Sequence, residues 1–298
     1  MNDVADFDVA IIGAGPSGSV SAALLHQQGF RVCVIERTHF PRFVIGESLL
    51  PYSMDILEEA DLVRVVQAQQ GFQYKNGAAF TWGERYTWFD FTDKFSKGPG
   101  TTFQVQRAVF DKILIDEVER RGVTVRYGQN VTGYEEVEGA SGEHLARLRI
   151  EAPEGAYTLQ ARFVLDASGY GRVLPRLLGL ERPSVLSPRK AIFTHIDDRI
   201  VGDDFDRNKI LISTHPAERG VWSWLIPFGN GRSSIGFIGE PEWINQRAAG
   251  LKAADEGALN EALLRGVVAE IPRLSRILRN AVWDNGVPFS SISNYSAN

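Results

Sequence analysis

The segment that most constrains the fold lies at the start of the chain, where a short apolar run meets a glycine-rich turn. Residues 7–12 are apolar and β-branched and predict a strand, and Gly13, Gly15 and Gly18 follow it directly as Gly-x-Gly-x-x-Gly. The small residues of 19–28 then predict a helix. A strand, a glycine turn and a helix in this order are typical of a dinucleotide-binding βαβ unit.

The residues of this turn have separate tasks in such a unit. Gly13 allows the tight turn, Gly15 lets the backbone approach a pyrophosphate, and Gly18 lets the helix pack closely on the strand. Pro16 and Ser17 stand at the predicted start of the helix, where unpaired N–H groups face the phosphate charge. The turn is therefore expected to bind the phosphates of a dinucleotide.

An acid completes the motif after a second predicted strand, residues 31–35. Glu36 follows the turn at close to the spacing of about 20 residues at which such units place a carboxylate for the ribose hydroxyls. An acid at this position disfavours a 2′-phosphate and therefore NADP. The motif alone leaves FAD and NAD open as ligands.

Charge and composition exclude several classes of protein. The chain has 298 residues, 32 Lys and Arg against 37 Asp and Glu, and a net charge of −5, which argues against nucleic acid as a partner. The single cysteine, Cys33, and five scattered histidines offer no disulfide and no metal site. Residues 1–8 are acidic and no apolar run reaches about 20 residues, so we expect a cytoplasmic protein without an integral membrane segment.

The rest of the chain predicts two domains. Residues 168–169 form a second glycine-bearing turn after a buried strand, so the chain returns to the parallel sheet there. We expect an α/β fold, a Rossmann-like parallel sheet of the FAD/NAD(P)-binding kind with a second domain of antiparallel sheet covered by helices. The expected helices are 52–69, 105–121 and a broken pair within 243–280; the expected strands are 78–82, 86–91, a meander of 123–127, 131–137, 145–150 and 157–160, then 162–167, 190–196, 209–214, 221–228 and 232–238.

Four segments make nearly the whole chain resemble the flavin-dependent halogenases, which have the para-hydroxybenzoate hydroxylase-like flavoprotein fold. They are the glycine turn with Glu36; residues 40–51, with Phe-Pro-Arg leading to Gly-Glu-Ser-Leu-Leu-Pro; residues 71–78, with Gly-Phe-x-x-Lys; and residues 222–227, Trp-Ser-Trp-Leu-Ile-Pro. The last segment is the specific one, because Trp-x-Trp-x-Ile-Pro is the usual mark of the halogenases within this fold. Its marker residues here are Trp222, Trp224, Ile226 and Pro227.

The resemblance implies FAD as the cofactor and a lysine as the catalytic residue. In this family, reduced flavin and oxygen oxidise chloride or bromide, and hypohalous acid travels through a tunnel to a lysine, which Lys75 matches. A lysine suits this task because its ammonium is a compact donor and its desolvated amine a nucleophile. The expected cofactor-binding residues are those of the glycine turn with Glu36, together with Arg37, Arg42, Gly46, Glu47, Ser48, Arg107, Asp166 and Gly169.

The resemblance also implies partners and a domain division. Residues 166–169 lack the Asp-Gly turn that single-component hydroxylases use near their pyridine nucleotide, which indicates a separate flavin reductase. Residues 40–48 look like those of the phenol- and pyrrole-type enzymes of antibiotic biosynthesis, so the aromatic substrate could be carrier-protein-tethered. The FAD-binding domain is expected to be discontinuous, over 1–72 and 101–182, with a substrate domain over 73–100 and 183–298.

Other functions of the same fold stay open. The chain could be an FAD-dependent aromatic hydroxylase or monooxygenase, a prenyl reductase, or an inactive flavin-binding relative. The last idea arises because family members have a second flavin motif, a strand ending in Gly-Asp, and this sequence stops at Asn298 without it, as expected of a truncated chain.

The residues of the expected site also have plainer interpretations. Trp222 and Trp224 share one face of a strand and could be core residues, and Lys75 on its own would be a surface lysine. Glu47 could cap a helix, and His195 is expected to be structural or exposed.

Overall fold

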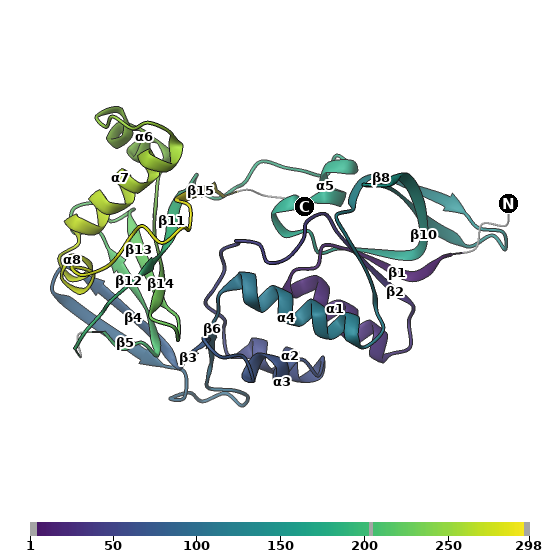
Figure 1. The fold of residues 1–298 in the computed structure, drawn as a ribbon, viewed down its shortest axis with the longest axis horizontal. Helices are drawn as coiled ribbons and strands as arrows, with labels where there is room; N and C mark the ends of the chain where they lie inside the picture. Colours follow the sequence, from purple (N-terminus) through teal and green to yellow (C-terminus); the bar gives the residue numbers. More distant parts are fainter. Residues whose placement is uncertain (1–4, 203–204, 295–298) are drawn as a thin grey trace.

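The computed structural model describes residues 5–202 and 205–294, which form two lobes, each built on its own sheet (Figure 1). Residues 295–298, on which the expected truncation rests, and residues 1–4 of the acidic N-terminus lie outside the described residues. The expected α/β class is confirmed, with a largely parallel sheet in one lobe and a largely antiparallel sheet in the other.

The first lobe contains a six-stranded sheet in the order β7-β2-β1-β10-β9-β8. The strands β7, β2, β1 and β10 are parallel to one another. The strand β9 pairs antiparallel with β10, and β8 pairs antiparallel with β9. Val9 to Ile12 are buried, as strands covered on both faces require. The strands are β1 (Phe7–Ile12), β2 (Val32–Glu36), β7 (Thr124–Tyr127), β8 (Asn130–Glu138), β9 (His144–Ala152) and β10 (Gly155–Asp166).

Two strand expectations in this lobe were wrong. The segments 157–160 and 162–167 are one strand, β10, because buried Ala161 pairs with Phe7 of β1 on one side and Ala146 of β9 on the other. Residues 124–127 pair in parallel with β2 and are not part of the meander, since Val125 lies beside Val34.

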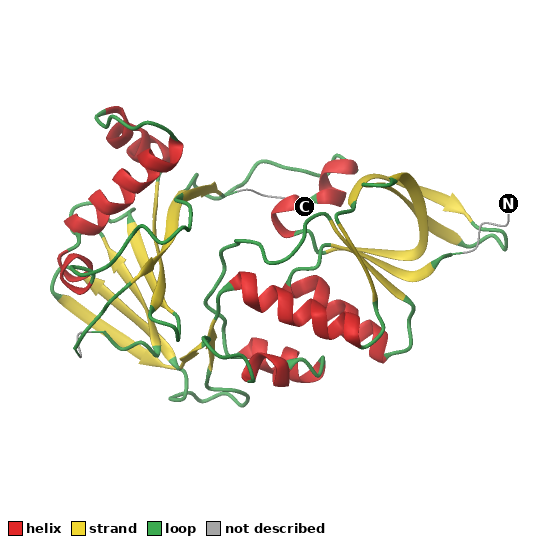
Figure 2. Ribbon diagram, viewed as in Figure 1, coloured by secondary structure: helices red, strands yellow, loops and turns green. Residues whose placement is uncertain are grey.

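Helices cover the six-stranded sheet on both sides (Figure 2). The helices α1 (Pro16–Gln27) and α4 (Arg107–Arg120) share a core with the sheet. Phe110 and Leu114 of α4 are buried there with Ala22 of α1 and with Ile11 and Val34 of the sheet. The expected helix 52–69 is two helices, α2 (Tyr52–Glu59) and α3 (Val63–Gln67), and that expectation was wrong. Asp61 has φ +55 between them, which turns Leu62 into the core. On the other side, α5 (Val173–Leu177) follows a short 3₁₀ turn, Gly169–Gly171.

The second lobe contains a seven-stranded sheet in the order β15-β11-β14-β13-β12-β4-β5. Only β12 and β4 are parallel neighbours, and β4 and β5 join this sheet from an early part of the chain. A two-stranded sheet of β3 (Gln73–Lys75) and β6 (Thr102–Gln104) lies between the lobes (Figure 1). The seven strands are β4 (Gly77–Trp82), β5 (Arg85–Asp90), β11 (Lys190–Asp197), β12 (Lys209–Thr214), β13 (Trp222–Pro227), β14 (Arg232–Gly239) and β15 (Ser290–Ser293).

Three helices cover one face of this sheet and leave the other face toward the first lobe (Figure 1). Leu263 and Val267 of α7 (Glu256–Glu270) pack on Leu225 and Phe237 of the sheet, between α6 (Pro241–Ala249) and α8 (Pro272–Ile277). The expected covering helices are therefore present. Within the described residues, no helix is long and apolar enough to cross a membrane.

Candidate cofactor and substrate site

The glycine turn closes tightly against the end of β10 and stays open at its middle glycine. A Cβ at Gly13, where φ is +101, would lie 2.7 Å from the Ala167 carbonyl oxygen, and one at Gly18 would lie 2.0 Å from the Gly13 oxygen. A Cβ at Gly15 would meet only Arg42 Nη2, at 3.6 Å. The turn therefore has the shape that lets a pyrophosphate approach the backbone at Gly15.

The helix that follows the turn leaves its first amides without a side-chain cap. Gly15 is the N-cap of α1, Pro16 begins the helix, and Ser17 follows it within the first turn. Uncapped N–H groups at a helix start attract phosphate oxygens.

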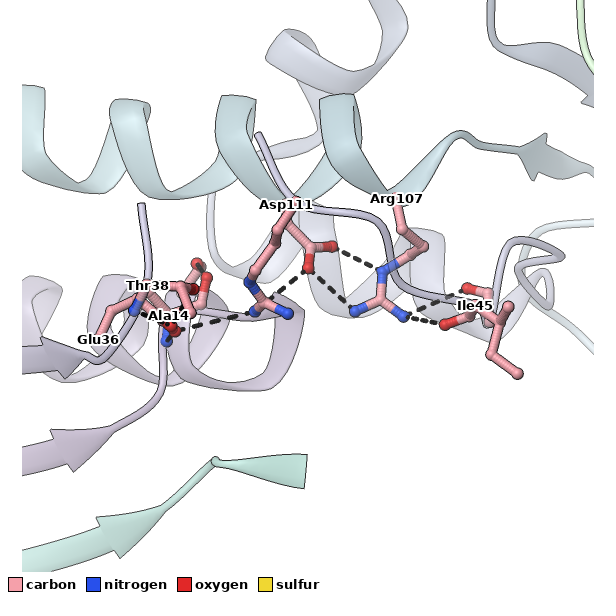
Figure 3. Close-up of polar contacts among 9 residues, drawn as sticks. Ala14, Glu36, Thr38, Ile45, Arg107 and Asp111 are labelled. Carbon is pink, nitrogen blue, oxygen red and sulfur yellow. Dashed lines mark hydrogen bonds and ion pairs between the residues drawn. The ribbon is translucent and has the colours of Figure 1, made fainter. Parts of the chain in front are cut away.

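Glu36, at the end of β2, is almost fully buried and already holds backbone groups. Its carboxylate accepts hydrogen bonds from Ala14 N at 2.9 Å and from Thr38 N and Oγ1 at 3.0 and 2.6 Å (Figure 3). A carboxylate offers about four acceptor positions, so one is left for a ribose hydroxyl. The residues present therefore fit the adenosine end of a dinucleotide cofactor.

A cavity of about 430 Å³ lies at the carboxyl ends of β1 and β2, and both lobes line it. Gly13, Glu36, Arg37 and Arg42 come from the first lobe, and Phe193 and residues 290–292 come from the second. Ligands of open parallel sheets bind at this edge. We therefore assign this space to the cofactor and name it the cofactor cavity.

The second glycine-bearing turn lies at the wall of the cofactor cavity. Its two expected cofactor-binding residues, Asp166 and Gly169, do not themselves line this cavity. Asp166 accepts hydrogen bonds from Ser168 N at 2.9 Å and Leu174 N at 2.8 Å. Gly169 has φ +56, and its neighbours Ser168 and Tyr170 do line the cavity.

A chain of charged groups runs from Glu36 to the loop that separates the lobes (Figure 3). Arg42 Nη2 lies 3.8 Å from Glu36 Oε2 and 3.6 Å from Asp111 Oδ2. Arg107 donates to Asp111 through Nε at 2.6 Å and Nη2 at 3.0 Å, and through Nη1 to the Ile45 carbonyl at 2.8 Å. Asp111 is fully buried and was not predicted, although its position four residues after Arg107 on one helix face was a usable signal.

Residues 45–49, named the strap here, connect this charged chain to the second lobe. The Glu47 carbonyl accepts from Val105 N at 2.7 Å, and Leu49 N donates to the Phe103 carbonyl at 3.1 Å. Gly46 within the strap has φ +98, and a Cβ there would lie 2.9 Å from Arg107 Nη1. The strap is therefore fixed along its length by backbone contacts and by Arg107.

Lys75, at the end of β3, is a buried lysine attached to the strap. Its side chain is 1% exposed, and its Nζ donates to Ser48 Oγ at 2.7 Å and to the Leu49 carbonyl at 2.6 Å. Burial lowers the pKa of its ammonium from 10.5 to about 8. A lysine with this pKa supplies both a hydrogen-bond donor and an appreciable fraction of neutral amine near neutral pH.

A second cavity, of about 420 Å³, lies between the strap and the inner face of the seven-stranded sheet, and we name it the apolar cavity. Its strap residues include Gly46, Glu47 and Ser48. Ile45 and Tyr170 line both this cavity and the cofactor cavity, so the two adjoin. Its lining from the sheet is mainly apolar and comprises Ala191, Ile210, Ile212, Trp222, Trp224, Ile226, Ile238 and Ile292.

The two tryptophans of β13 differ in burial. Trp224 is 8% exposed, donates from Nε1 to Ser234 Oγ at 3.1 Å, and lies over Gly236, where a Cβ would be 2.3 Å from its ring. Trp222, with its ring centre 6.3 Å from that of Trp224, is half-buried. Pro227 is buried, pairs with Ser233 and does not line the apolar cavity.

The structure corrects the plainer interpretation of Glu47 and gives His195 a structural contact. Glu47 caps no helix: its Oε1 lies 2.5 Å from His195 Nε2 of β11, and both residues are buried. The expectation that His195 would be structural or exposed missed this contact, because no local pattern links residues so far apart in the chain.

The fold and site define an FAD-binding domain. The sequence profile of that family, described as "FAD binding domain", matches residues 6–274, and the chain belongs to it. FAD, the expected cofactor, is thereby confirmed. Separately, Cys33 of β2 is buried, and burial raises the pKa of its thiol to about 11.

The chain is similar to proteins that are named as flavin-dependent enzymes. It is 28% identical to a tryptophan 2-halogenase of Chondromyces crocatus over 88% of this chain and 50% of that protein. The crystal structure of CmlS, a flavin-dependent halogenase, has TM-score 0.82 and 28% identity over 98% of this chain and 50% of that one. A flavoprotein/dehydrogenase from Cytophaga hutchinsonii has TM-score 0.84 and 40% identity over 97% of this chain and 67% of that one.

The expected resemblance to flavin-dependent halogenases is confirmed by these relatives. The chain spans about half the length of the curated relatives it matches.

Proposed function

We propose that this protein is an FAD-dependent halogenase that acts on an electron-rich aromatic compound with chloride or bromide. The observation that carries the proposal is Lys75, a buried lysine with a lowered pKa, whose ammonium donates a hydrogen bond to Ser48 of the strap. Lys75 itself lines neither cavity, but Ser48 lines the apolar cavity, which adjoins the cofactor cavity. The substrate is of the phenol or pyrrole type, free or carrier-protein-tethered, and a separate flavin reductase in the cytoplasm supplies the reduced cofactor.

The residues of the cofactor cavity and of the adjoining glycine turn would together bind FAD along its length. The backbone at Gly15 and the start of α1 would bind the pyrophosphate, and Glu36 the ribose. Arg42 and Arg107 stay paired with Asp111 and orient the loop beside the cofactor. Bound reduced FAD supplies, with oxygen, the oxidation of halide to hypohalous acid.

Lys75 would hold the oxidised halogen for transfer to the substrate. Its ammonium can donate a hydrogen bond to hypohalous acid, and its neutral amine can form a haloamine by displacing hydroxide, which takes the amine proton to leave water. The apolar cavity would exclude water and present Trp222 to a flat aromatic ring.

The two-domain division follows the same proposal. Residues 1–72 and 101–182 would bind FAD, while residues 73–100 and 183–298 would shape the substrate space. Lys75 lies on β3, in the small sheet between the two lobes. Under this proposal, the FAD-binding domain and the substrate domain must meet there.

A flavin-dependent dehydrogenase or reductase is the second candidate function. The 40% identity to the Cytophaga hutchinsonii flavoprotein/dehydrogenase favours it, and the apolar cavity suits an apolar substrate such as a prenyl chain. In that case Lys75 would only anchor the strap.

Product analysis separates the two candidates. The purified protein, FAD, a flavin reductase, NADH and oxygen are incubated with a phenol or a pyrrole in chloride, bromide or halide-free buffer, and product masses are measured. We expect a halide-dependent mass increase that Lys75→Ala abolishes while the bound-flavin spectrum stays, with Lys112→Ala on the surface of α4 as the matched control. Reduction of a double bond without halide, or halogenation by Lys75→Ala, would contradict the proposal.

A further inference from the structure

We propose that His195 is a positioning residue that acts through Glu47 to hold the strap, and through the strap to hold Lys75. The inference rests on the proposed role of Lys75. It concerns a contact between β11 of the second lobe and the strap, which no local sequence pattern indicates.

Neighbouring strap residues point their side chains to different parts of the molecule. Glu47 reaches His195 on β11 at 2.5 Å, whereas Ser48 accepts the hydrogen bond from Lys75 on β3 at 2.7 Å. Ser48 also pairs with Gln104 as an isolated antiparallel bridge, so the strap is extended there. The strap is thus fixed to the seven-stranded sheet on one side and to the small sheet on the other.

The Glu47–His195 contact is buried and borders a small cavity of about 280 Å³, which both residues line. Glu47 is 2% exposed and His195 is 6% exposed. The imidazole lies edge-to-face between Phe43, at 5.0 Å between ring centres, and Phe228, at 5.1 Å. Removing one partner of a buried polar pair leaves the other without compensation for its lost hydration, so the strap would have to move toward water.

The position of the lysine ammonium depends on the strap. Both hydrogen-bond acceptors of Lys75, the Ser48 hydroxyl and the Leu49 carbonyl, are strap atoms. Its third neighbour is the ring of Phe91, 5.2 Å from Nζ. A strap displaced from β11 would therefore carry both acceptors away from Lys75 and let water reach its amine.

The chain offers a matched control in a second buried histidine. His215 is 4% exposed, and its Nε2 lies 2.8 Å from Glu270 Oε2, beside Trp243. This pair connects the end of β12 to α7 on the helix-covered face of the sheet and contacts no strap residue. Its loss tests whether the removal of any buried histidine that contacts a glutamate affects the strap.

Hydrogen exchange of the cofactor-free protein tests the inference first. We expect His195→Ala to speed exchange of the Leu49 and Val105 amides about ten-fold or more. Both amides donate the hydrogen bonds that join the strap to residues 103–105. We expect His215→Ala to leave those amides unchanged. His195→Gln, which keeps a side-chain N–H donor near Glu47, should restore most of the protection.

The pKa of the Lys75 amine gives a second measurement, which a general loss of stability would not change. Its pKa, measured from the pH dependence of amine labelling read by mass spectrometry, should rise from about 8 toward 10.5 in His195→Ala. It should stay near 8 in His215→Ala.

Equal acceleration by both alanine variants, or unchanged strap exchange and Lys75 titration in His195→Ala, would overturn the inference. If His195→Ala does not fold, Glu47→Ala replaces it, because it removes the acceptor of the same contact. Faster strap exchange in this variant supports the inference, and unchanged exchange contradicts it. These measurements use no halide and no reductant, so a failed halogenation assay would count against the proposed function alone.

Discussion

At the scale of single residues, the lowered pKa of Lys75 makes the stability of the folded protein depend on pH. Its pKa is about 8 in the folded chain, against the ordinary 10.5 expected when unfolded. Between these values the unfolded chain binds more protons, so stability rises with pH from about 8 to 10.5, and the cost of the buried charge is fully present below pH 8. We therefore expect Lys75→Met to stabilise the protein at pH 7 by up to about 3 kcal/mol.

Urea unfolding at pH 7 and pH 10 checks this prediction. The advantage of Lys75→Met should shrink above pH 8 and be nearly lost at pH 10. Lys209→Met is the control, because Lys209 is also buried but lies 2.8 Å from Asp206, so its loss should destabilise at both pH values. A Lys75→Met variant that is less stable than wild type at pH 7 would show that burial of the ammonium carries no such cost.

At the scale of elements, different glycines of the turn between β1 and α1 are needed for folding and for cofactor binding. A Cβ at Gly18 would overlap the Gly13 carbonyl oxygen, at 2.0 Å, whereas a Cβ at Gly15 would have only Arg42 as a neighbour, at 3.6 Å. We expect Gly15→Ala to keep the stability of the FAD-free chain within about 1 kcal/mol and to weaken FAD binding about ten-fold or more. Gly18→Ala should destabilise the chain itself by about 2 kcal/mol or more.

Thermal unfolding without FAD and fluorescence titration with FAD measure the two effects separately. Unchanged FAD affinity in Gly15→Ala would mean that the pyrophosphate does not approach the backbone at this glycine.

Elements with a local signal were predictable from the sequence, and elements set by distant contacts were not. The strand over residues 7–12 agrees with β1 because its apolar run and the following glycine are both local. The break between α2 and α3 was missed because Asp61 adopts φ +55 where no glycine marks a turn in the sequence, while Leu62 beside it is buried. The Glu47–His195 pair belongs to the same class, since the two residues come together only in the folded chain. Asp111 differs, because its i,i+4 spacing from Arg107 was a local signal that the prediction did not use.

At the scale of the whole molecule, the two lobes have separate cores and share the cofactor cavity. Ile11 and Leu114 belong to a core of the first lobe, and Leu225 and Val267 to a core of the second. The cofactor cavity is lined from both lobes. The charged chain ends at the strap, and Glu47 of the strap contacts His195 of the second lobe, so the strap links the two lobes beside this cavity.

This arrangement predicts how FAD changes thermal unfolding. Without FAD the lobes should unfold in two overlapping calorimetric transitions, because each buries its own core. FAD at about 100 times its Kd should add about 2.7 kcal/mol to the folded state, raising the lower transition by several degrees and bringing the two together. If the two transitions instead stay separate when FAD is bound, and only one of them moves, the cofactor is bound by one lobe alone, and the contribution of Phe193 and residues 290–292 to its cavity carries no binding energy.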